Sequence, residues 1–240
     1  MSGHSKWSTI KRKKEKTDQQ RAKIFTKIGR ELSVAVKEGG SPDPGVNTKL
    51  FDIIQKAKQN NVPNDNIERI IKKAAGEGDS SNYEEAVYEG YGPSGVALIV
   101  QALTDNKNRT AADLRHFFDK YGAGLGTPGC VSFMFTDTGL ILIPKEGIDE
   151  DKLMEDALES GASDFIASDE YFEVYTDPSD LRAVTEELTQ KGYKIESSEH
   201  DKLPSNYVTI TDPDMTIKME KLLEVLEDHD DVQEIFHNLE

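Results

Sequence analysis

The sequence is poor in cysteine, tryptophan and long hydrophobic runs, with one cysteine and one tryptophan in 240 residues. A single thiol, Cys130, excludes an internal disulfide and a cysteine-rich zinc site. The longest aliphatic run, residues 96–100, is too short to span a membrane, and no apolar segment follows the N-terminal cations as it would in a secretory signal. These absences favour a soluble protein of a reducing compartment, and we expect a cytoplasmic location.

The sequence also lacks the groups of residues on which catalysis or metal binding depends. The five histidines show no ligand spacing on a helix face, Cys130 and the serines have no identifiable base partner, and the acidic clusters lie at predicted helix ends. Residues 124–129, Gly-Leu-Gly-Thr-Pro-Gly, match a dinucleotide-binding fingerprint, but they follow a predicted helix and precede a predicted strand, which is the reverse of what that site requires. We therefore predict a turn there, and a protein that is not an enzyme and needs no cofactor, metal or small-molecule substrate.

Charge is present in excess and is unevenly spread. The chain has 29 lysines and arginines, 45 acids and a net charge of −16, yet residues 1–80 carry +7 and residues 81–240 carry −23. Ten of the cations lie within residues 1–30, beside two acids. This asymmetry predicts an anionic partner for the basic region, whereas the acidic remainder would repel a polyanion. A flexible, solubilising basic tail is the alternative interpretation.

Residues 1–16 contain almost nothing apolar except Trp7 and Ile10, which predicts an extended arm. A helix is expected over about residues 18–37, and its apolar residues recur with a spacing that places them on one side while Lys23, Lys27 and Arg30 face the other. Such a cationic face suits a phosphate backbone, and an ordinary solvated face is the alternative. The nucleic-acid-binding candidates of this region are Lys6, Trp7, Lys11, Arg12, Lys13, Lys14, Lys16, Arg21, Lys23, Lys27 and Arg30.

A second candidate phosphate contact comprises Lys107, Asn108 and Arg109. These polar residues lie between an apolar strand at 96–103 and a helix expected over 110–121, where unpaired backbone N–H groups attract anions. A plain helix cap explains the same residues equally well.

The order of elements predicts an α+β fold. Two further amphipathic helices follow the first, residues 76–82 form a linker, and the pattern then changes to mixed strands and helices, including a strand at 130–135. Residues 140–198 give a strand–helix–strand–strand–helix–strand series, the ferredoxin-like pattern, with its last strand at 194–198. The tail adds a strand at 207–210, a helix and a final strand at 232–236. We therefore predict an N-terminal three-helix domain (1–80), a discontinuous α/β middle domain (81–136 plus 204–240) and an inserted, acidic, ferredoxin-like third domain (137–203).

Several long segments carry a resemblance to a known family. They are GHSKW (3–7), RAKIFTKIGREL (21–32), PNDNIERIIKK (63–73), YEGYGPSGVALIV (88–100) and LTDNKNRTAADLRHFFDKYGAGLG (103–126). Together they resemble the YebC/PmpR family, and the resemblance implies three domains and no catalytic residues. Phe51 departs from the family pattern, which usually has another arginine in that segment.

The resemblance also bears on function. Members of the family are labelled DNA-binding transcriptional regulators, the mitochondrial relative is a translational activator, and bacterial relatives are linked to ribosomes stalled on proline-rich stretches. A thin basic arm with an aromatic residue suits irregular RNA, and we see no clear helix-turn-helix. We therefore predict a ribosome- or rRNA-binding translation factor that helps stalled elongation, with a DNA-binding transcriptional regulator as the alternative. The sequence predicts no membrane partner and does not indicate an oligomeric state.

Overall fold

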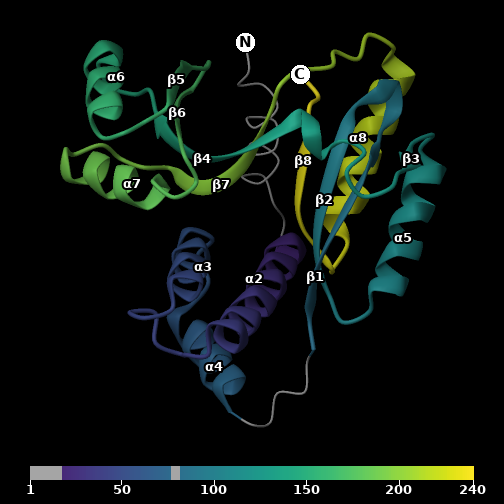
Figure 1. The fold of residues 1–240 in the computed structure, drawn as a ribbon, viewed down its shortest axis with the longest axis horizontal. Helices are drawn as coiled ribbons and strands as arrows, with labels where there is room; N and C mark the ends of the chain where they lie inside the picture. The colour runs from purple at the N-terminus through teal and green to yellow at the C-terminus, as the bar shows by residue number, and fades with distance from the viewer. Residues whose placement is uncertain (1–17, 77–81) are drawn as a thin grey trace.

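The computed structural model describes residues 18–76 and 82–240. The described residues form a helical head and two sheets, and Figure 1 shows the head below the sheets, which stand side by side with helices next to them. The predicted basic arm, with its seven candidate residues, lies outside the described residues.

The head consists of α2 (Asp18–Gly39), α3 (Thr48–Gln59) and α4 (Asn64–Ala75). Helix α2 ends where the sequence predicts, because Gly40 adopts a positive φ of 63°. Asn47 fixes the start of α3, since its side-chain oxygen accepts the Leu50 N–H at 3.0 Å. The three helices bury one apolar cluster, made by Ile28, Leu32, Ala35, Val36, Leu50, Ala57, Val62, Ile67 and Ala74.

The first sheet is antiparallel with the order β3-β1-β2-β8. Its strands are β1 (Glu84–Tyr91), β2 (Ala97–Thr104), β3 (Gly124–Leu125) and β8 (Val232–His237), with the short 3₁₀ turn η1 (Pro93–Gly95) between β1 and β2. Helices α5 (Lys107–Lys120) and α8 (Pro213–Asp228) pack on one face and bury Leu98, Leu114, Phe118 and Leu222 among others. The last strand therefore pairs with a strand formed 130 residues earlier, as register Ala102↔Val232 shows.

The second sheet is also antiparallel and has the order β5-β6-β4-β7. Its elements follow the chain as β4 (Phe135–Pro144), α6 (Glu150–Glu159), β5 (Asp164–Ala167), β6 (Tyr171–Thr176), α7 (Leu181–Gln190) and β7 (Ser197–Pro204). This order confirms the predicted ferredoxin-like arrangement, and with the head and the first sheet it confirms the α+β fold. The domain boundaries at 80, 136 and 203 stay predictions.

Three predicted strands were wrong in place or in kind. Residues 130–134 form no strand, because they turn through η2 (Ser132–Met134) before β4 begins at Phe135. The strand predicted at 194–198 begins at Ser197 instead. Residues 207–210 form only an isolated parallel bridge, Val208↔Leu239.

The side chain of Glu89 explains the turn at 130–134. Its carboxylate accepts N–H groups from Gly129, Val131 and Ser132 at 2.8–2.9 Å, so these donors are taken and do not pair with a neighbouring strand. Burial raises the pKa of Glu89, but the three backbone hydrogen bonds outweigh burial and lower it. The turn predicted at 124–129 is present only in its later part, where Gly129 has a φ of 87°, because Gly124 and Leu125 form the short strand β3 beside β1.

No helix within residues 18–76 and 82–240 is long and apolar enough to cross a membrane.

Candidate nucleic-acid interface

Helix α2 carries the predicted cationic face, which we call the cationic stripe: Lys23, Lys27 and Arg30. At a rise of 1.5 Å per residue, the three residues extend over about 10 Å along one side of the helix. The structure places them against residues 227–231, Glu-Asp-His-Asp-Asp, which we call the acidic segment. The predicted phosphate-facing surface is therefore in contact with acidic groups of the same chain.

Each cation of the stripe reaches one part of the acidic segment. Lys23 forms an ion pair with Asp228 at 2.5 Å, and Lys27 donates to the main-chain oxygen of Glu227 at 2.7 Å. Arg30 donates to the main-chain oxygen of Asp230 at 2.8 Å, and it also donates to Asp231 Oδ1 at 2.9 Å.

Asp231 is the most buried acid of the segment, with a side chain 4% exposed. Besides Arg30 on Oδ1, its Oδ2 accepts from Arg109 at 2.8 Å and lies 3.2 and 2.9 Å from the hydroxyls of Thr104 and Thr110. Burial raises the pKa of Asp231, but hydrogen bonds from Arg109, Thr110 and Arg30 outweigh burial and lower it to about 2. One carboxylate thus joins α2, β2 and α5.

The acidic segment begins at the C-terminus of α8, where the helix dipole is negative and the last carbonyl oxygens lack partners within the helix. The last turn of α8 contains no basic residue and ends in Glu227 and Asp228. The cations that offset this negative end come from α2, through Lys23 and Lys27.

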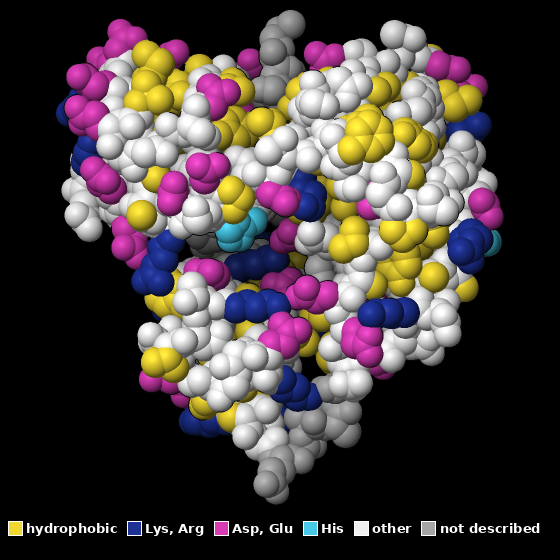
Figure 2. All heavy atoms as spheres, viewed as in Figure 1, with side chains coloured by type: hydrophobic (Ala, Val, Ile, Leu, Met, Phe, Trp, Pro, Cys, Tyr) yellow, Lys and Arg dark blue, Asp and Glu magenta, His cyan; other side chains and the backbone are white. Residues whose placement is uncertain are grey.

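A cavity of about 600 Å³ opens between α2, α5 and the end of α8. Cations and carboxylates both line it. Figure 2 shows lysine, arginine and acidic side chains gathered where the head meets the two sheets. The lining residues are Lys23, Arg30, Asp105, Arg109, Phe117, Val225, Asp228, His229, Asp230 and Asp231.

The second candidate contact lies in the first turn of α5. The helix-cap interpretation is confirmed, because Asn106 accepts the Arg109 N–H at 3.1 Å. Lys107 pairs with Glu84 at 2.7 Å, and Arg109 pairs with Asp105 and Asp231. Asn108 is exposed. The structure thus brings Arg109 to the cationic stripe through Asp231.

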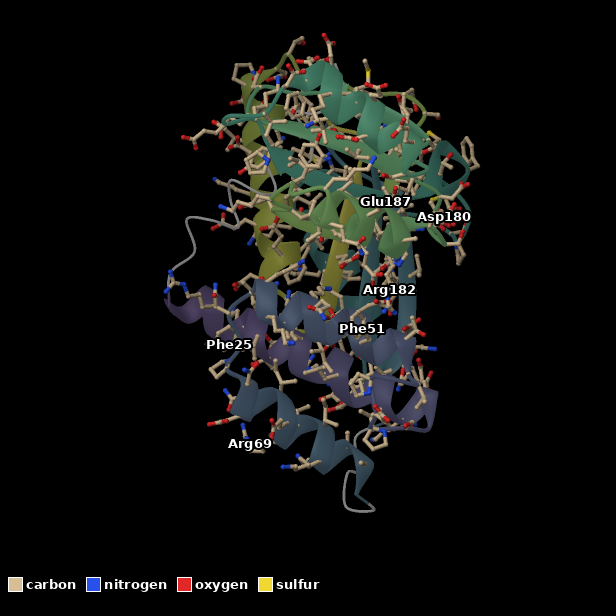
Figure 3. The ribbon with its side chains drawn as sticks, turned by 90° about the vertical axis from the view of Figure 1, so that its left-hand side faces the viewer. Phe25, Phe51, Arg69, Asp180, Arg182 and Glu187 are labelled. Atoms are coloured by element: carbon tan, nitrogen blue, oxygen red, sulfur yellow. The ribbon has the colours of Figure 1, made fainter. Side chains whose placement is uncertain are left out.

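Other predicted residues and one missed group lie on the head. Arg21 is exposed on the first turns of α2. Arg69, Lys72 and Lys73 are exposed on α4, and Figure 3 shows Arg69 on the outer side of the head. Their spacing of three and four residues was the available signal for a second cationic face, and the predicted site residues do not include them.

Two more contacts fix the head beside the sheets. Lys56 of α3 donates to Glu31 of α2 at 3.0 Å and to Glu234 of β8 at 2.9 Å. Burial lowers the pKa of Lys56, but the two carboxylates outweigh burial and raise it. Arg182 of α7 lies 4.3 Å above the ring of Phe51, and Figure 3 shows this pair between α7 and α3. Phe51 of the head therefore contacts a cation of α7, a helix of the second sheet.

The described residues contain no group of three histidine, cysteine, aspartate or glutamate side chains arranged to hold a metal. Burial raises the pKa of the Cys130 thiol, with the nearby Glu89 adding to the effect. A raised pKa disfavours the thiolate, which is the nucleophilic and metal-binding form of the side chain.

Comparison with known proteins covers nearly the whole chain. A family profile described as "TACO1/YebC protein N-terminal domain" matches residues 5–77, and one described as "TACO1/YebC second and third domain" matches residues 83–239. A relative from Acetivibrio thermocellus named "Probable transcriptional regulatory protein" is 59% identical over 99% of this chain and 98% of its own length. A relative of the same name from Finegoldia magna is 55% identical over 99% and 98%.

A solved structure supports the fold at this level of similarity. It is described as a conserved hypothetical protein, Aq1575, from Aquifex aeolicus. It superposes with a TM-score of 0.83 at 44% sequence identity, covering 94% of this chain and 92% of that chain.

Proposed function

The chain belongs to the TACO1/YebC family, and on that premise we propose that it is a non-enzymatic, nucleic-acid-binding regulator of gene expression that acts on the ribosome. Its predicted role is to bind ribosomal RNA and to help elongation stalled on proline-rich stretches. The predicted first contact is the basic arm with Lys6, Trp7, Lys11, Arg12, Lys13, Lys14 and Lys16.

The charge distribution is the observation that carries this proposal. Ten cations and two acids occupy residues 1–30, while residues 81–240 carry −23. A narrow basic arm can enter structured RNA by stacking and phosphate contacts, whereas an acidic body is repelled from a long duplex laid along it. Contact through one end of the molecule follows from these charges.

A DNA-binding transcriptional regulator is the second candidate, favoured by the name "Probable transcriptional regulatory protein" of the relatives. The exposed cations of α4 offer it a surface, because Arg69, Lys72 and Lys73 lie on a helix that follows α3 after a short turn. This candidate predicts that duplex binding depends on α4 rather than on the arm.

Co-sedimentation with purified ribosomes, in the presence of excess duplex DNA, separates the two candidates. The arm variant replaces Lys11, Arg12, Lys13 and Lys14 with alanine. A matched control replaces four exposed cations of α5 and α8, changing the net charge equally: Arg115, Lys120, Lys218 and Lys221.

We expect the wild type and the control variant to pellet with ribosomes despite the DNA, and the arm variant to remain in the supernatant. The salt dependence of binding should also flatten in the arm variant, by up to about one log–log unit for each phosphate that the arm no longer neutralises. Release of the wild type by DNA, together with loss of duplex binding when Arg69, Lys72 and Lys73 are replaced, would establish the DNA-binding candidate instead.

A further inference from the structure

The cationic stripe has the length, charge and placement of a phosphate-binding surface, yet acidic groups of the same chain occupy it. Lys23 and Asp228 are 39% and 58% exposed, so this pair is open to solvent and to competing ions. Exposed ion pairs contribute little net stability and are screened by salt. The Lys23–Asp228 pair can therefore be exchanged for a contact with another polyanion at low cost, whereas Arg30 and Asp231 form a more buried pair, 18% and 4% exposed.

The acidic segment is poorly explained by the needs of its own helix. Carboxylates at a helix C-terminus face the negative end of the dipole and are unfavourable there. Glu227 and Asp228 occupy that end of α8, and α2 supplies the compensating cations. Lys23 and Lys27 of the head thus supply partners for Glu227 and Asp228. Asp231 also has partners next to its own sheet, namely Arg109, Thr104 and Thr110.

Apolar packing does not bind the stripe to the acidic segment. The buried cluster of the head is formed by residues of α2, α3, α4 and the turn between α3 and α4. The buried cluster of the first sheet is formed by other residues, from β1 to the C-terminus. Ion pairs and hydrogen bonds of long side chains join the two across a cavity of about 600 Å³, which leaves room for movement.

We propose that residues 227–231 are an internal mimic of a polyanion, which competes with nucleic acid for the cationic stripe, so that a phosphate backbone binds the stripe only when the head leaves the acidic segment. The inference rests on the proposed function, since it assigns a regulation to the same basic surface. It makes the closed arrangement of Figure 1 the form with lower affinity for nucleic acid.

The first test is an affinity comparison of three full-length proteins: the wild type, Asp228→Asn and Glu220→Gln. Asp228→Asn removes the carboxylate that pairs with Lys23, and Glu220→Gln removes one exposed carboxylate two turns earlier on the same helix. The probes are a fluorescein-labelled RNA hairpin and a labelled DNA duplex of matched length, followed by fluorescence anisotropy. We expect Asp228→Asn to bind the preferred probe about two- to five-fold more tightly, the range set by removal of one exposed ion pair, and Glu220→Gln to bind like the wild type.

The second test follows the head directly, in a Cys130→Ser background with dyes attached at Lys58→Cys on α3 and Lys221→Cys on α8. Both positions are exposed. We expect energy transfer between the dyes to change when saturating RNA hairpin or duplex is added, and the same change to begin at lower nucleic-acid concentration in Asp228→Asn.

The possible failures are distinct. If the wild type and Asp228→Asn bind neither probe, the proposed function is wrong and the inference falls with it. If the wild type binds tightly while energy transfer is constant and Asp228→Asn gains no affinity over Glu220→Gln, only the internal competitor is wrong.

Discussion

Asp231 shows how much of the arrangement depends on single side chains. Its carboxylate accepts hydrogen bonds from Arg30 of α2, from Arg109 of α5 and from the hydroxyl of Thr110. The main-chain oxygen of the same residue accepts the Leu103 N–H at 2.8 Å, which ties the segment to β2. A buried anion of this kind stabilises the fold only while its donors are in place.

Asp231→Asn should lower the free energy of unfolding by about 1–3 kcal/mol, because the charged hydrogen bonds to Arg30 and Arg109 are removed. The folded-state pKa of Asp231, about 2, lies below its ordinary value of 3.8, so its stabilisation is complete above about pH 4 and is lost as the pH falls through 2. Urea unfolding at several pH values should therefore show a gap between wild type and variant that closes in acid.

Asp230→Asn is the matched control, since Arg30 contacts the main-chain oxygen of Asp230. It should unfold close to the wild type. A gap for Asp231→Asn that keeps its size down to about pH 2 would contradict the role assigned to the carboxylate.

Phe51 and the cationic stripe mark what residue patterns could and could not predict. The helical spacing correctly predicted the apolar and cationic sides of α2. The partner of the cationic side could not be predicted, because Lys23 and Asp228 are 205 residues apart and nothing local links them. In the sequence, Phe51 was noted only because the family resemblance implies an arginine in that segment. Its contact with Arg182 could not be predicted, because it depends on how α7 lies beside the head.

Two lysines of helix α3 connect the head to the first sheet: Lys49 pairs with Glu85 of β1, and Lys56 pairs with Glu234 of β8. Lys56 lies between Glu31 of α2 and Glu234 of β8 and pairs with both. Without this lysine the two neighbouring carboxylates would repel each other. Burial raises the pKa of Glu31 and outweighs the lowering effect of Lys56, while the neighbouring Glu234 raises it further. The positive charge of Lys56 therefore helps to hold α3 between Glu31 of α2 and Glu234 of β8.

Lys56→Met should lower the free energy of unfolding by about 1–3 kcal/mol, less than for a fully buried pair because about a third of the Lys56 side chain is exposed. The methionine keeps much of the aliphatic stem, so the destabilisation reports charge rather than packing. Lys58→Met, at an exposed position of the same helix, is the control. Equal denaturation curves for both variants would show that the bridge contributes nothing.

At the scale of elements, regular patterns were predicted well and contacts between distant side chains were not. The ferredoxin-like series was correct because its strands and helices alternate with clear periodicity. The strand at 130–134 failed because Glu89, on another strand, takes the N–H groups of Gly129, Val131 and Ser132. The strand predicted at 207–210 was also wrong, since this segment forms only the isolated bridge Val208↔Leu239.

The head is joined to the first sheet and to the acidic segment by several ion pairs. Lys23, Arg30, Lys49 and Lys56 of the head all pair with carboxylates of the first sheet or of the acidic segment. The screening length of such pairs falls from about 10 Å at 0.1 M salt to about 3 Å at 1 M. The relative position of head and sheets should therefore respond to ionic strength more than the fold of either does.

Small-angle X-ray scattering should show a larger radius of gyration in about 1 M than in about 0.1 M sodium chloride, with unchanged far-ultraviolet circular dichroism, because screening weakens the ion pairs but leaves both apolar cores intact. A variant with Lys23, Lys27 and Arg30 replaced by alanine should show the larger radius already at low salt. Superimposable scattering curves at both salt concentrations would show that charge does not hold the head.

The late position of β8 and the acidic segment in the chain has a consequence for synthesis. Proteins are made from the N-terminus, so α2 leaves the ribosome long before residues 227–231 exist. The strand β8, which pairs with β2 in the first sheet, is likewise made after β1, β2 and β3. Every newly made copy therefore passes through an interval in which its basic helix is complete and its acidic cover is still untranslated, and this interval occurs beside the RNA of the ribosome that is making it.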